Sequence, residues 1–160
     1  MSQPLWWRDR EALALLALRY FPWFAALNLM WETAQLPLYT IWTDATYGEI
    51  AFAVFHCTLV DVLIGATALA ITLTLTRTRA PEDWRWVRIA ILLVLLGAAY
   101  TAFSEWMNTT LLRWAYSALM PTLNLGGIKI GLSPLAQWVV VPLLALYLTR
   151  SSVRSEATGK

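Results

Sequence analysis

Residues 50–76 read IAFAVFHCTLVDVLIGATALAITLTLT, an apolar run interrupted by His56 and Asp61. The hydrocarbon core of a bilayer is about 30 Å thick, and a helix needs about 20 residues to cross it. This run is longer than that, so it predicts a membrane-spanning helix.

Three further apolar blocks lie at residues 12–36, 86–106 and 132–148. Of the 160 residues, 59% are hydrophobic and 14% are charged, which is too little polar side chain to cover a water-exposed surface. We therefore expect an all-α polytopic membrane protein. Residues 1–150 would form a single four-transmembrane-helix bundle, and residues 151–160 a disordered cytoplasmic tail.

The first apolar block contains Arg19 and Pro22, which allow two interpretations. We favour one long, tilted helix in which Arg19 reaches the headgroups. In the alternative, residues 6–18 form an interfacial helix and the span starts near Pro22, because proline suits a first helical position. The choice decides whether Glu32 lies inside the bilayer or at its outer boundary.

Basic residues collect in the N-terminal segment, in the 77–88 connection and in the tail, whereas the 37–48 connection has none. The positive-inside rule then predicts that both termini lie in the cytoplasm. The net charge of +2 is too small to indicate a nucleic-acid partner.

Tryptophans fall at the predicted membrane boundaries, where an amphipathic indole is favoured. The inner boundary would hold Trp6, Trp7, Trp84 and Trp86, and the outer one Trp31, Trp42, Trp106, Trp114 and Trp138.

Strongly polar side chains inside the spans are the most informative residues, because a charged group at the bilayer centre costs about 3 kcal/mol on insertion scales. Each predicted span contains at least one, and nearly all lie in the outer half. We expect a polar pocket there, between the helices. The candidate catalytic residues are Glu32, His56, Asp61 and Glu105, and the candidate binding residues are Gln35, Ser104, Asn108, Trp114, Tyr116 and Gln137. The structural alternative is hydrogen bonding between helices.

His56 and Asp61 are five residues apart, so their side chains diverge by about 140° around a helix. Asp61 instead shares a face with small residues, among them Gly65 and Ala68, which allow another helix to approach closely. We therefore expect the partner of Asp61 to lie across the bundle.

The sequence contains no complete catalytic, nucleotide or phosphate-binding motif. A single histidine excludes a two-histidine metal site, although His56 with Glu32, Asp61 and Glu105 could still ligate a metal if the helices converge. We assign no metal, and the cofactor is unknown.

The 107–131 connection has more apolar and aromatic residues than a solvated loop needs, including Trp114 and Tyr116. It could fold back as a lid over the pocket, which would suit a lipid-like ligand. Alternatively, it lies flat on the membrane interface.

Four strings carry a resemblance: WETAQLPLY at 31–39, HCTLVD at 56–61, SEWMN at 104–108 and LSPLAQW at 132–138. They resemble a group of small proteobacterial inner-membrane proteins over nearly the whole chain, which implies a location and no particular activity. The Trp114-x-Tyr116 pattern beside membrane-embedded acids is similar to integral membrane enzymes that cyclise or hydrate carotenoids and other isoprenoids by acid catalysis.

Three functions fit these patterns. The first is an enzyme that modifies a lipid or isoprenoid, with Glu32, Asp61 and Glu105 as acid and base. The second is a proton-coupled transport component that uses Asp61 and His56, which would need oligomerisation because four helices make a narrow bundle. The third is an accessory or assembly subunit whose polar face meets partner membrane subunits.

Overall fold

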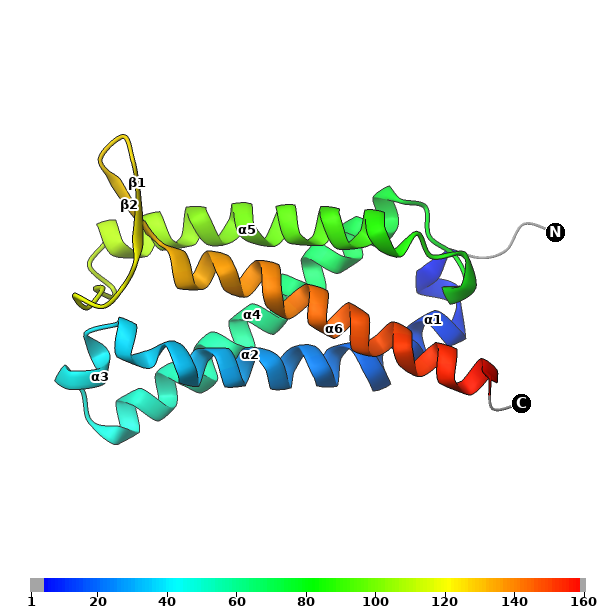
Figure 1. Ribbon diagram of the computed structural model, residues 1–160, viewed down its shortest axis with the longest axis horizontal. Helices are drawn as coiled ribbons and strands as arrows, with labels where there is room; N and C mark the ends of the chain where they lie inside the picture. Colours follow the sequence, from blue (N-terminus) through cyan, green and yellow to red (C-terminus); the bar gives the residue numbers. More distant parts are fainter. Residues whose placement is uncertain (1–4, 159–160) are drawn as a thin grey trace.

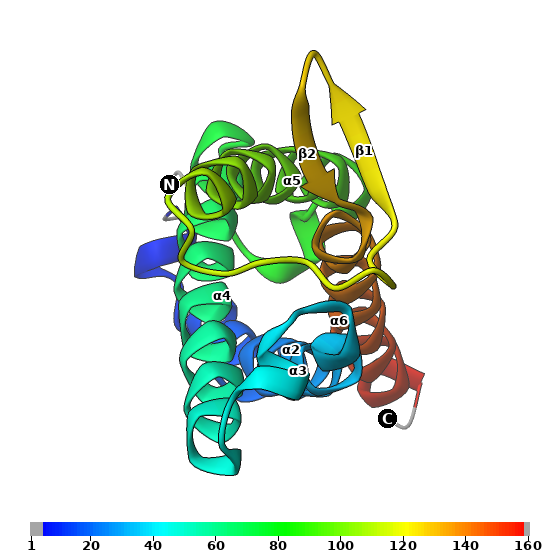
Figure 2. The same cartoon turned by 90° about the vertical axis from the view of Figure 1, so that its left-hand side faces the viewer.

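The computed structural model describes residues 5–158, with the backbone alone for Leu125 and residues 152–158. Four long helical segments pack as a ring in which each contacts the next along the chain and the first contacts the last (Figures 1 and 2). Their bounds are Arg10–Leu38 for the first, which includes α1 and α2, then Tyr47–Leu75 for α4, Trp86–Thr110 for α5 and Leu132–Thr158 for α6. The prediction of four helices long and apolar enough to span a membrane is confirmed.

The two ends of the ring differ in structure (Figure 1). At the end that we call the terminus end, the first helix begins, α6 ends, and the 76–85 connection joins α4 to α5. At the opposite end, the hairpin end, lie the short helix α3 (Ile41–Asp44) and a β-hairpin. Short 3-10 turns cover Trp6–Arg8, Leu36–Leu38 and Pro81–Asp83.

The first helix is continuous, as the favoured interpretation predicted. It consists of α1 (Arg10–Leu15), a π-helical turn (Leu16–Tyr20) and α2 (Phe21–Gln35). Pro22 has no N–H to donate, and its ring would crowd the carbonyl four residues earlier in a regular α-helix. The π turn before it widens the backbone, with Phe21 N–H donating to the Leu16 carbonyl.

Helix α4 begins three residues before the predicted span because Thr46 and Glu49 form a capping box at its N-terminus. Helix α6 continues to Thr158, which corrects the prediction of a disordered tail from residue 151; residues 159–160 lie outside the described chain. Arg, Glu and Ala in this stretch are good helix formers, and the preceding span supplies the nucleus.

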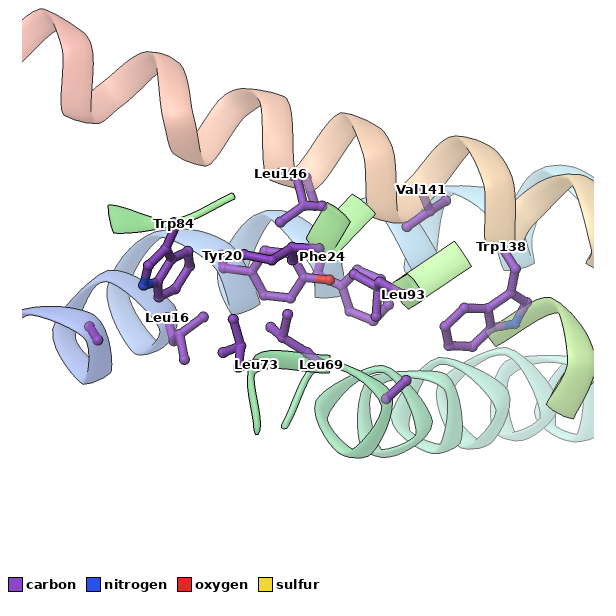
Figure 3. Close-up of a cluster of buried hydrophobic side chains, with 14 residues drawn as sticks. Leu16, Tyr20, Phe24, Leu69, Leu73, Trp84, Leu93, Trp138, Val141 and Leu146 are labelled. Carbon is purple, nitrogen blue, oxygen red and sulfur yellow. The ribbon is translucent and has the colours of Figure 1, made fainter. Parts of the chain in front are cut away.

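The apolar core lies between the helices and extends from the terminus end to the middle of the ring (Figure 3). Tyr20 and Phe24 of the first helix stack with ring centroids 5.4 Å apart, and Phe24 lies 6.1 Å from Trp138 of α6. Trp138, which the sequence predicts at the outer boundary, is 2% exposed and packs in this core rather than facing outward. Within residues 135–141 of α6, the inward face includes Trp138 and Val141, which are both buried.

Two glycines make this packing achievable. A side chain on Gly65 would overlap the Phe24 ring, and one on Gly97 would overlap the indole of Trp138. Small residues at helix contacts allow close approach in membranes, where apolar burial does not drive association as it does in water. The expected small face beside Asp61 is therefore occupied by the first helix, through Phe24.

The β-hairpin departs from the all-α fold that the sequence predicts. Strands β1 (Thr122–Leu125) and β2 (Ile128–Gly131) pair antiparallel, with Leu125 opposite Ile128. Gly126 and Gly127 form the turn at φ of +60° and +91°, conformations that glycine adopts at little steric cost. A Gly-Gly pair between two short β-prone runs is a recognised hairpin signal, so the sequence held this information.

The outer surface of the ring is apolar. On α4, Phe52, Phe55, Leu59 and Leu63 are each at least 59% exposed. Such a surface suits lipid rather than water, in keeping with a multi-pass membrane protein.

Candidate functional site

The centre of the polar cluster is the side-chain amide of Gln137, in the second turn of α6. Its Nε2 donates to Asn28 Oδ1 at 2.9 Å, Glu32 Oε1 at 3.0 Å and Asp61 Oδ2 at 2.8 Å. Three helices therefore meet at one amide nitrogen. Because that nitrogen carries two hydrogens, three acceptors share two N–H groups.

The network continues toward the hairpin end along α2 and α6. Gln35 Nε2 donates to Glu32 Oε1 at 2.8 Å, and the Ser133 hydroxyl donates to Gln35 Oε1 at 2.9 Å. Asn28, Glu32 and Gln35 are spaced by four and three residues, so they lie on one face of α2.

The carboxyls of Glu32 and Asp61 lie next to each other, because both accept from the same Gln137 nitrogen. Within residues 5–158, their hydrogen-bonding partners are carboxyl and amide groups, with no Lys or Arg among them. Both residues keep some exposed surface, whereas Asn28 and Gln137 are buried. The two carboxyl residues are thus partly exposed, whereas the amide groups that they meet are buried.

A second polar unit lies nearer the hairpin end, around Glu105 of α5. Tyr116 donates to Glu105 Oε2, and Tyr39 donates to Oε1 at 3.5 Å. The Tyr116 hydroxyl also accepts from the Gly131 N–H at 2.9 Å, which ties the end of β2 to the same group. Trp114 places its buried indole N–H near this carboxyl without forming a regular hydrogen bond.

The segment that carries Trp114 and Tyr116 lies across the hairpin end of the ring (Figure 2). It is held there by Thr40 N–H donating to Ala115 O at 3.0 Å and Ser117 N–H donating to Leu38 O at 2.9 Å. The Ser117 hydroxyl adds a bond to the Pro37 carbonyl at 2.8 Å. The connection therefore folds back over the bundle, in the position expected of a lid.

Burial raises the pKa of both tyrosines outside the spans. For Tyr39 the neighbouring Glu105 charge adds to the effect of burial. For Tyr116 the hydrogen bond to Glu105 and its charge add in the same direction. Both hydroxyls consequently stay protonated at neutral pH and remain available as donors to the carboxyl.

Tyr116→Phe is expected to lower the free energy of unfolding by about 1–3 kcal/mol, because it removes a donor to Glu105 and leaves the Gly131 N–H without its acceptor. Thermal melting of the purified protein in detergent measures this. Tyr147→Phe is the matched control, since Tyr147 is 67% exposed on α6. Equal melting temperatures for the two variants would contradict the proposed role of Tyr116.

The structure brings several predicted site residues together and separates others. Glu32, Gln35, Asp61 and Gln137 form one network, and Glu105, Tyr116 and Trp114 form the second unit. His56 joins neither: it is exposed on the outer surface of α4 and stacks on Phe52, with ring centroids 5.5 Å apart. The 140° divergence from Asp61 accounts for this separation.

Ser104 and Asn108 bond mainly to each other. Asn108 Nδ2 donates to the Ser104 carbonyl at 2.8 Å and to its hydroxyl at 3.1 Å. In the described part of the chain, no group of three or more His, Cys, Asp or Glu side chains is arranged to hold a metal. With His56 facing outward, the set of His56 with three carboxyls does not form.

Three residues of these polar units are not among the candidate site residues predicted from the sequence: Asn28, Tyr39 and Ser133, whose hydroxyl donates to Gln35. Asn28 is 1% exposed and accepts from Gln137, and Tyr39 donates to Glu105. The signal for Asn28 was its spacing, four residues before Glu32 within an apolar run. No sequence signal marks Tyr39, because its contact depends on how the 36–40 turn meets the 113–117 segment.

Comparison with protein-family models, with curated proteins and with solved structures finds no match.

Proposed function

We propose that this protein is an inner-membrane enzyme, with both termini in the cytoplasm, that moves protons on a lipid-like or isoprenoid molecule. The observation that supports it is the Glu32–Asp61 pair: two adjacent carboxyls, from different helices, sharing the Gln137 amide and without a basic partner in residues 5–158. Basic residues at the terminus end support the orientation.

The pair is suited to acid–base chemistry because two carboxyls this close are stable together when one holds a proton for the other. The protonated carboxyl can donate its proton to one alkene carbon, which leaves a carbocation on the other. The unprotonated carboxyl can then remove a proton from the carbon next to that cation, so that the double bond moves. If a second double bond of the same molecule attacks the cation first, a ring bond forms before the proton is removed. The net change is isomerisation or cyclisation, with no change in formula and with both carboxyls exchanging roles. Gln137 holds both carboxyls in place.

The surroundings favour a membrane-soluble substrate. Glu32 and Asp61 keep part of their surface exposed, and α4 presents an apolar exterior to lipid. At the hairpin end α4 lies beside α2 and away from α5 (Figures 1 and 2). A substrate would approach from this side, under the segment that carries Trp114 and Tyr116.

The test uses heavy water, because proton transfer at carbon leaves a deuterium that does not wash out. Purified protein is incubated in buffered heavy water with total lipid extract from its own membranes, and lipids are measured by mass spectrometry after return to ordinary water. We expect one lipid class to gain carbon-bound deuterium. Asp61→Asn and Glu32→Gln should lower the rate by about 10²–10⁴-fold, the usual contribution of a general acid or base.

Glu11→Gln is the control, since Glu11 is exposed near the terminus end. Melting temperatures confirm that each variant is folded. Absence of deuterium in every lipid with folded wild-type protein would refute the enzyme proposal, as would an unchanged rate in Asp61→Asn.

That negative outcome would favour the accessory-subunit alternative, which has its own support. The hairpin projects from the ring, and Leu123 and Ile128 are 43% and 38% exposed on it (Figure 2). An exposed apolar hairpin is a natural contact for a partner membrane subunit. In that case the carboxyl network holds the helices together.

A further inference from the structure

An apolar groove lies at the terminus end, between the first helix and α4. It has a volume of about 280 Å³, and its lining includes Trp6, Leu13, Ala66, Ala70 and Leu73. Along α4, Ala66 to Leu75 spans about 14 Å at 1.5 Å per residue, and Arg77 follows two residues after the helix ends. That is about half of the ~30 Å hydrocarbon core, the depth of one leaflet.

A basic hollow of about 600 Å³ lies at the end of this groove, in the connection between α4 and α5. It is lined by Thr76, Arg77, Thr78, Arg79, Asp83 and Arg85. Three guanidinium groups and one carboxylate give it a net charge of +2 (three minus one). Arg77, Arg79 and Arg85 are exposed, so their charge is accessible to a ligand.

The groove and the hollow meet at Trp6. Its backbone N–H donates to the Thr78 carbonyl at 3.1 Å, and its indole N–H donates to the Thr74 hydroxyl at 3.3 Å. Trp6 lines the groove, and Thr78 lines the hollow. The two spaces therefore lie side by side, one apolar along the helices and the other basic where the helices end.

We propose that the groove and the hollow together bind one anionic phospholipid. Its phosphate lies among Arg77, Arg79 and Arg85, and one acyl chain lies in the groove beside Ala66 and Ala70. Guanidinium groups recognise phosphate oxygens through paired N–H groups, and basic hollows at helix ends are typical headgroup sites. Asp83 can accept hydrogen bonds from the hydroxyls of a glycerol headgroup, which favours phosphatidylglycerol. The site is separate from the carboxyl cluster and does not depend on its function.

The experiment is a lipid titration of the full-length protein in detergent, followed by native mass spectrometry. Phosphatidylglycerol and phosphatidylcholine with identical acyl chains are the probes. We expect phosphatidylglycerol to bind at least about tenfold more tightly, since each basic residue near an anionic headgroup contributes to affinity. The triple variant Arg77→Gln, Arg79→Gln, Arg85→Gln should reduce its affinity to that of phosphatidylcholine.

Matched controls distinguish lipid binding at the groove and hollow from attraction to surface charge in general. Arg88→Gln removes an exposed arginine at the same end but outside the hollow, and it should leave the preference unchanged. Ala70→Phe fills the groove and should weaken both lipids, whereas Ala99→Phe, exposed on α5, should weaken neither.

Three results would overturn the proposal. They are equal affinity for the two lipids, an equal loss of preference in the Arg88 variant, and complete displacement of phosphatidylglycerol by inorganic phosphate. The last would show a phosphate site that does not use the groove. Melting temperatures of all variants are measured in parallel, so that loss of folding is distinguished from loss of binding.

Discussion

Gly97→Val is expected to prevent the ring from forming its native packing. A Cβ on Gly97 would overlap the indole of Trp138, and that ring is 2% exposed and packed beside Phe24. Overpacking a filled core costs about 1–3 kcal/mol and sometimes more, and here the overlapped atoms belong to a rigid bicyclic ring with no room to move. The expected result is a severe loss of monodisperse protein on size-exclusion chromatography.

The control is Ala99→Val, two residues along α5 on its exposed side, which should purify normally. A rescue makes the test specific: Trp138→Leu in the Gly97→Val background frees the space and should restore part of the yield. Normal yield and melting temperature for Gly97→Val alone would show that α5 and α6 do not pack through this contact.

Gln137→Leu is the second large effect that we expect. It removes the one nitrogen that serves Asn28, Glu32 and Asp61 while keeping side-chain volume similar. A buried acceptor left without a donor costs about 1–3 kcal/mol, and more when it is charged. The melting temperature should therefore fall well below that of the wild type, and more than in Tyr116→Phe.

A double-mutant cycle checks the cause. Asp61→Leu alone, Gln137→Leu alone and the two together are compared by unfolding in detergent. If the Gln137–Asp61 hydrogen bond is the source of the destabilisation, the double variant should lose less unfolding free energy than the two single variants added together. The reason is that it no longer leaves the Asp61 carboxyl facing an apolar side chain. A strictly additive result would place the importance of Gln137 elsewhere.

The four helices could be predicted from sequence because the cost of exposing a backbone to lipid forces each long apolar run into a helix. The polar residues inside those runs could also be named in advance, since an unpaired polar group in lipid is costly, and Glu32, Gln35, Asp61 and Gln137 do meet. Which groups pair depends on the rotation of each helix. That rotation is set by side-chain fit, such as Phe24 at Gly65, which no single-helix pattern contains.

His56 and Trp138 show that residue type alone does not determine which face of a helix a residue occupies. Residue type predicts the histidine in the site and the tryptophan at the boundary. The helix faces placed His56 toward the exterior and Trp138 in the core. The five-residue spacing from Asp61 already separated His56 from the other polar groups, so the geometry was a better guide than the chemistry of the side chain.

The contact between the first and last helices has a consequence for how the chain is made. Glu32 accepts a hydrogen bond from the side-chain amide of Gln137, which lies 105 residues later in the chain. At a synthesis rate of about 5–20 residues per second, Gln137 is made roughly 5–20 s after Glu32. During that interval Glu32 has Gln35 of its own helix as a donor but lacks the Gln137 amide, so the ring closes only after the last helix is made.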